Sequence, residues 1–176
     1  MPLSQKSDSI VIMNLLAQLF EAQLCHIYYA EKEIIKALPK MARAARCENL
    51  KVAFIYHIGQ TSEQIEKLEQ VFQSIDKIPG ANTRGAVAEI LSEGNYIIQQ
   101  FGDSPCIDAA LICVGQKIEH YEIATYGCLI AWAKLLGYHP AACLLSQILD
   151  QEEITDRELT DLAEYVCNGT AETEAA

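Results

Sequence analysis

Hydrophobic residues recur along most of the chain at intervals of three and four positions, the spacing of one face of an α-helix. In the first long segment this apolar stripe runs from Leu16 to Met41, with polar residues between its members. Comparable stripes occupy four later segments. The pattern predicts five helices, over residues 9–45, 48–75, 84–101, 104–136 and 140–166.

Capping residues and helix breakers mark the ends of these segments. Residues 7–9 supply side-chain oxygens that can cap the first helix. Pro79 and Gly80 interrupt the chain after the second helix. Proline at position 105 is typical of a first helical position, and Gly137 is typical of a helix C-cap.

The lengths of the segments predict how the helices are connected. Four helices are long, and the shorter third helix lies in a long connection between two helical hairpins. The predicted fold is therefore all-α, a four-helix bundle with a fifth, shorter helix in its crossover connection. Residues 9–167 form one domain, with a flexible N-terminus over 1–8 and a disordered acidic tail over 168–176.

Charge and composition exclude several classes of function. The formal net charge of −11 repels phosphate backbones and anionic lipids, so we expect binding to neither nucleic acid nor membranes. No apolar run approaches the roughly 20 residues of a membrane span. The seven cysteines are odd in number and form no Cys-x-x-Cys pair, which indicates free thiols in a reducing cytoplasm.

Three glutamates interrupt the apolar stripes. Glu122 has apolar residues at nearly all its helical neighbour positions, and Glu31 and Glu152 repeat the pattern on other helices. A carboxylate on a core-facing stripe must be paired, protonated or bound to a metal, because burying a bare charge is costly. Three such residues on three helices predict a bundle with a cation at its centre.

Two further residues extend this candidate site. Glu119 lies one helical turn from Glu122, so two negative charges come close together, and without a cation at least one would hold a proton. His57 is the only histidine on a predicted core stripe, and it is a candidate metal ligand.

Each candidate also has a purely structural interpretation. Glu122 can be hydrogen-bonded to a tyrosine or lysine, and His57 can be an ordinary satisfied core histidine. Glu31 can pair with His57 or accept a hydrogen bond from Tyr28, one turn away. Glu119 can occupy a solvated rim, and Glu152 can belong to a solvated acidic face.

Several segments resemble the YciE/YciF ferritin-like proteins. The most specific is Lys117–Gly127, which reads KIEHYEIATYG. Shorter similarities lie at residues 30–32, 36–42 and 108–112, and residues 155–163 are similar to the family's closing segment. The resemblance covers nearly the whole predicted domain.

The resemblance implies a dimeric ferritin-like bundle in the bacterial cytosol, in a family with links to stress responses. Ferritin-like proteins bind two metal ions through glutamate and Glu-x-x-His ligands, a donor set that suits iron or manganese. The ions react with oxygen or peroxide. Carried over to this sequence, the resemblance implies the ligands Glu31, Glu119, Glu122 and Glu152.

The second helix departs from the family pattern. Relatives tend to read His-x-x-Glu-Thr there, whereas this chain has His57 followed by Gln60 and Thr61. The last helix lacks Glu-x-x-His, because Thr155 stands three residues after Glu152. Losing one bridging anion puts a two-ion site in doubt and leaves a single-metal site open.

Three functions therefore compete. The preferred one is a metal-binding protein that handles oxygen, peroxide or iron, although whether it is an enzyme stays open. A second is a non-catalytic bundle whose centre is a hydrogen-bond network of Glu31, His57, Gln60 and Glu122, acting through self-association or partner binding. A third is a bundle that binds an organic ligand, with Trp132 and the tyrosines as walls.

Overall fold

The computed structural model describes residues 3–80 and 85–169, with side chains from residue 14 onward. These residues form five α-helices, a short π-helix and no strand. The elements are α1 (Leu3–Ala44), α2 (Glu48–Ser74), α3 (Val87–Phe101), α4 (Ile107–Leu136), α5 (His139–Leu162) and the π-helix η1 (Ala163–Cys167).

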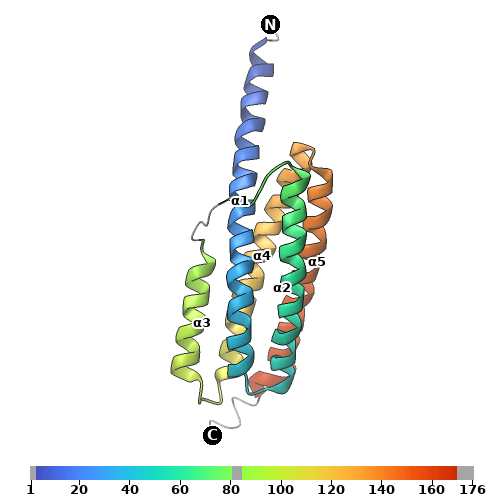
Figure 1. Cartoon of the computed structure of the whole chain (residues 1–176). Coiled ribbons are helices and arrows are strands. Elements are labelled where there is room, and N and C mark those ends of the chain that lie inside the picture. The colour runs from blue at the N-terminus through green and yellow to red at the C-terminus, as the bar shows by residue number, and fades with distance from the viewer. Residues whose placement is uncertain (1–2, 81–84, 170–176) are drawn as a thin grey trace.

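The four long helices pack as two antiparallel hairpins. α1 pairs with α2 and α4 pairs with α5, while α2 lies beside α5 and α1 beside α4, which closes the bundle (Figure 1). The shorter α3 packs outside against α1 and α4 and carries the chain back along the bundle. The prediction of an all-α four-helix bundle with a fifth helix in the crossover is confirmed.

The predicted ends of the chain need correction. α1 begins at Leu3, so the predicted start at Ser9 is too late, and most of the segment expected to be flexible is helical. Extending an existing helix costs little free energy, because each added residue contributes a hydrogen bond and no new helix has to be nucleated. In the predicted tail, residues 168–169 continue as helix. Residues 170–176 lie outside the described residues. The same holds for residues 1–2 and for residue 84, the predicted start of the third helix.

Gly137 ends α4 as its position predicted. Its φ of 75° lies in the left-handed region, which glycine adopts without a steric penalty. The N–H groups of Gly137 and Tyr138 donate to the carbonyls of Lys134 and Ala133, at 3.2 and 2.8 Å. This cap turns the chain directly into α5, so the two helices run antiparallel.

Apolar side chains from all four long helices fill the two ends of the bundle. Phe20, Leu24 and Phe72 are among those fully removed from solvent. The middle is different, because polar residues replace apolar ones there on α1, α2, α4 and α5. None of the described helices combines the length and apolar character needed to cross a membrane.

Asp108 ties the second hairpin to the first. It lies in the first turn of α4 and is only 9% exposed. Its two carboxylate oxygens accept the backbone N–H groups of Arg46 and Cys47, at 2.8 and 2.9 Å, in the turn between α1 and α2. Cys47 is the N-cap residue of α2 and provides no side-chain cap, so α4 supplies the anion that this helix terminus favours.

Asp108→Ala should therefore weaken the whole bundle. The substitution leaves two amide donors near the core without their acceptors, and we expect the free energy of unfolding to fall by about 2 kcal/mol or more. Urea denaturation followed by circular dichroism measures this loss. Asp103→Ala, an exposed position in the preceding loop, is the matched control, and equal stability of the two variants would contradict the clamp.

Candidate metal centre

Four metal-ligating side chains converge in the middle of the bundle. His57 comes from α2, Glu119 and Glu122 from α4, and Glu152 from α5, and one ligand atom of each lies within 4.8 Å of all the others. All four residues are at most 3% exposed. When one ion binds its ligands at about 2.1 Å, two ligand atoms on opposite sides of the ion lie about 4 Å apart. The spacing in this cluster is only slightly larger, so small side-chain movements would place its four ligand atoms around a single ion.

The helices bring these residues together through their register. Glu119 and Glu122 lie one turn apart, so both point from the same face of α4. His57 and Glu152 interrupt the apolar stripes of α2 and α5, and these two helices lie side by side in the bundle. Four of the five predicted site residues therefore meet in one cluster.

Glu31, the fifth predicted residue, lies beside this cluster rather than within it. It is fully buried on α1, and its Oε1 accepts a hydrogen bond from the hydroxyl of Tyr126 on α4. Its Oε2 is buried without a hydrogen-bond partner. The charge of Glu31 contributes to the raised pKa values of Glu119, Glu122 and Glu152, so it acts on the cluster at short range.

The cluster holds most of the buried polar atoms without partners in the described part of the chain. Both carboxyl oxygens of Glu122 and Glu152 lack a hydrogen bond, as do Oε2 of Glu119 and Nε2 of His57. Buried polar atoms nearly always find a partner, and unpaired acceptors are costly. A cation would satisfy these atoms together, and a set of carboxylates with one imidazole is a suitable donor set for iron or manganese.

Burial dominates the protonation equilibria of the site. It raises the pKa of Glu31 to about 7, although the hydrogen bond from Tyr126 opposes the shift. It raises the pKa of Glu119 to about 8, and it holds the pKa values of Glu122 and Glu152 well above 4.5, where the charge of Glu31 adds to the effect. Without a cation, these carboxyls therefore bind protons instead.

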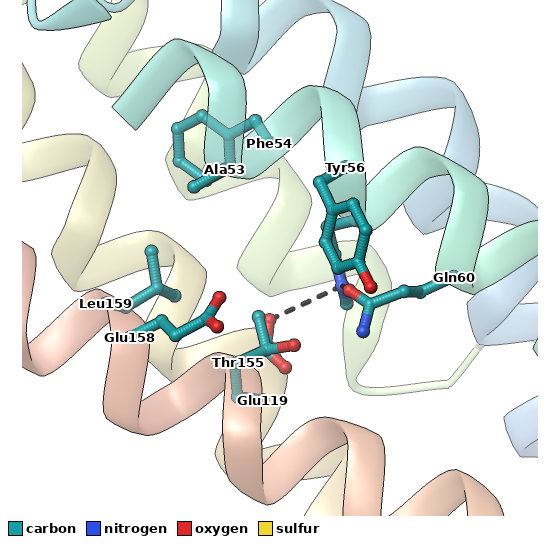
Figure 2. Close-up of a pocket in the computed structure, with 9 residues that line it drawn as sticks. Ala53, Phe54, Tyr56, Gln60, Glu119, Thr155, Glu158 and Leu159 are labelled. Carbon is teal, nitrogen blue, oxygen red and sulfur yellow. Dashed lines mark hydrogen bonds and ion pairs between the residues drawn. The ribbon is translucent and has the colours of Figure 1, made fainter. Parts of the chain in front are cut away.

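Burial has the opposite effect on the imidazole. It lowers the pKa of His57 to about 4, because the charged ring is the form that loses solvation. His57 is therefore neutral at physiological pH. Its Nε2 lies 3.5 Å from Oε1 of Glu119, an approach that Figure 2 marks with a dashed line.

The structural interpretations of the acids are wrong in several particulars. Glu122 has neither a tyrosine nor a lysine partner, and the burial of Glu119 and Glu152 excludes a solvated rim or face. The acids instead lie next to one another, Glu31 by Glu122 and Glu119 by Glu152, so a hydrogen bond within either pair requires a proton on one of its carboxyls.

The predicted partners of Glu31 are also wrong. His57 faces Glu119 rather than Glu31, and Tyr28 donates to Glu69 at 2.8 Å. Glu31 accepts its hydrogen bond from the hydroxyl of Tyr126, across the interface between α1 and α4. Such pairings depend on how each helix is rotated about its axis. Closeness of two residues along one helix does not reveal that rotation.

Two buried residues escaped the sequence analysis. Tyr126 lies four positions after Glu122, so both residues lie on one face of α4. This spacing is the feature of the sequence that could have indicated the burial of Tyr126. Gln64 lies seven positions after His57 on the same face of α2 and is fully buried. Its amide nitrogen donates to Oε1 of Gln151 at 3.3 Å, which links α2 to α5 just beyond the cluster.

A small cavity reaches the cluster between α2 and α5. Its volume is about 10 Å³, which is about enough for one water molecule. Of the cluster residues, His57 and Glu119 line this cavity. Tyr56, Gln60 and Glu158 also line it (Figure 2). Tyr56 in its wall is 64% exposed, so the cavity lies close to the surface.

The raised carboxyl pKa values predict the pH dependence of stability in chelator-treated protein. The folded state keeps protons that the unfolded state releases near pH 4.5, so stability decreases as pH rises through about 7 and 8. His57 opposes this trend only below its ordinary pKa of 6.5, because its folded pKa is lowered. The melting temperature should therefore fall between pH 6.5 and 8.

Glu122→Gln tests the origin of this dependence. The neutral amide removes one carboxyl of raised pKa, so the melting temperature should fall less steeply with pH than in the wild type. Glu93→Gln changes a half-exposed carboxylate and should follow the wild-type slope. Parallel curves for Glu122→Gln and the wild type would show that the buried acids do not set the slope.

Comparison with known proteins identifies relatives over nearly the full length. Protein YciF of Escherichia coli (strain K12) is 40% identical over 164 residues, which are 93% of this chain and 99% of the relative. The crystal structure of the E. coli stress protein YciF superimposes with a TM-score of 0.81 at 41% identity, over 84% of this chain and 94% of that one.

A second solved structure agrees. YcfI, a putative structural protein from Rhodopseudomonas palustris, matches with a TM-score of 0.80 at 36% identity, over 82% of this chain and 92% of the other. Residues 15–172 match the family described as a domain of unknown function, DUF892. The chain is therefore a member of the DUF892 family, with the helical architecture of YciF.

Proposed function

We propose that this protein binds a single divalent iron or manganese ion through His57, Glu119, Glu122 and Glu152. The observation that carries the proposal is the convergence of four buried ligand atoms within 4.8 Å, in a cluster where most of the carboxyl oxygens have no hydrogen-bond partner. A neutral imidazole and several carboxylates form a mixed donor set that suits these two metals.

The arrangement favours one ion over two. Four ligand atoms already surround one point, whereas Glu31, which lies against Glu122, has one of its oxygens engaged by Tyr126. Residue 60, where the family resemblance implies a further acid, is the neutral Gln60. A second ion would therefore lack the bridging carboxylate that shields two cations from each other.

The proposed chemistry is the handling of oxygen, peroxide or iron. When bound, iron or manganese supplies one-electron exchange with oxygen or peroxide. The chain itself contributes a cavity beside His57 and Glu119 that is large enough for about one water molecule. The hydroxyl of Tyr126 holds the ionisable carboxyl of Glu31 next to the cluster. Kinship with the E. coli stress protein YciF supports a role in stress.

The competing functions receive less support. Hydrogen bonds alone would join the acids only in pairs, Glu31 with Glu122 and Glu119 with Glu152, and only while these carboxyls hold protons. An organic ligand does not fit the cavity at the cluster. Trp132, the expected wall of such a site, lines a separate hollow with Tyr121 and Cys128.

Metal binding is tested directly by anaerobic loading. Dialysis of the wild type against ferrous or manganous ions, followed by elemental analysis, should give about one ion per chain. Glu122→Gln keeps the size of the side chain but removes a charged ligand, and the affinity should fall at least about 100-fold. Glu93→Gln, a surface substitution, should bind like the wild type. A wild type that binds neither ion would refute the proposal.

Reactivity requires a separate measurement. Protein loaded with ferrous iron and mixed with oxygen or hydrogen peroxide should oxidise the metal faster than free iron does in the same buffer. Glu122→Gln should reduce the protein-dependent rate at least about tenfold. Stopped-flow absorbance follows the oxidation. Equal rates with and without protein would leave a metal-binding role but exclude the proposed chemistry.

A further inference from the structure

Gln60 lies beside the imidazole of His57 in the wall of the cavity. The two residues are three positions apart on α2, and Oε1 of Gln60 is 3.4 Å from Nδ1 of His57. Gln60 is half-buried, whereas His57 is 3% exposed. Among the described residues, Gln60 is the hydrogen-bond partner of Nδ1.

The other ring nitrogen faces the cluster. Nε2 is buried without a hydrogen-bond partner and lies 3.5 Å from Oε1 of Glu119. A neutral imidazole carries one proton, on Nδ1 or on Nε2, and only the unprotonated nitrogen can bind a metal. The Gln60 oxygen is an acceptor, so it favours the tautomer with the proton on Nδ1 and the lone pair on Nε2.

We propose that Gln60 is a positioning residue that fixes the tautomer and ring orientation of His57, so that the Nε2 lone pair points into the cluster. Histidines that bind metals almost always donate their other N–H to an oxygen acceptor, and such partners strengthen metal binding. The benefit to metal binding rests on the proposed function, whereas the tautomer itself does not.

Gln60 is the residue at which α2 departs from the family pattern, and its contact with His57 gives it a role of its own. Gln60 is not simply the loss of a carboxylate ligand, because its oxygen contacts the ring nitrogen that faces away from the cluster. A glutamate at this position would also accept the Nδ1 proton. It would, however, add a further acid to a site where four carboxyls already have raised pKa values. The amide provides the acceptor without that charge.

Nitrogen NMR can read the tautomer without any metal. The chain has four histidines, and replacing His26, His120 and His139 with Gln leaves His57 as the single imidazole. In ¹⁵N-labelled, chelator-treated protein, long-range proton–nitrogen correlations distinguish a protonated ring nitrogen from an unprotonated one. The Gln60→Met and Gln60→Glu variants are made in this background, with circular dichroism melting to confirm folding.

We expect protonated Nδ1 and unprotonated Nε2 when residue 60 is Gln. Gln60→Met retains the length but not the oxygen, so a proton should appear on Nε2, and the dissociation constant for ferrous or manganous ions should rise about 10- to 100-fold. Gln60→Glu should restore the Nδ1 proton and metal binding.

Two results would overturn the assignment. One is a proton on Nε2 in the parent protein, and the other is an unchanged tautomer in the folded Gln60→Met variant. Failure of the parent protein to bind either metal is a different outcome, because it refutes the proposed function while the nitrogen spectra still decide the role of Gln60.

Discussion

Four carboxyl groups are buried at one level of the bundle, and their desolvation sets the electrostatics of its whole centre. Glu31, Glu119, Glu122 and Glu152 are all nearly or fully removed from water. Their charges can coexist there only when protons or a cation compensate them, because each ionised group raises the pKa of its neighbours. A bound metal ion and protons on the acids are thus two alternative ways to neutralise the negative charge of this centre.

The apolar layers and the Asp108 clamp offset the cost of this polar centre. Fully buried side chains at both ends of the bundle supply the hydrophobic stabilisation that the middle lacks. Asp108 fixes α4 against the turn between α1 and α2, at one end of the molecule. Register set there determines which residues of α4 reach the centre, because one residue of slip rotates a helical position by about 100°.

The sequence predicted the features that depend on helical period alone. The period indicated the four long helices, the burial of Glu31, Glu122 and Glu152, and the core position of His57. Pairings across helix interfaces could not be predicted this way, since they depend on rotation and register. Hence Tyr126 rather than Tyr28 reaches Glu31, and His57 faces Glu119. The early start of α1 escaped because polar residues extend a helix without an apolar stripe.

The distribution of charge around the centre is uneven, and it connects the site with its access. The polar residues that α2 brings to the centre and the cavity are all neutral near physiological pH: His57, Gln60, Thr61 and Gln64. The acids of the centre come from α1, α4 and α5. His57 therefore adds a neutral ligand to a group of acids, and the cavity that reaches the cluster is lined by neutral residues of α2 together with Glu119 of α4 and Glu158 of α5. A small reactant that enters this cavity meets His57 and Glu119 as the cluster residues in its wall.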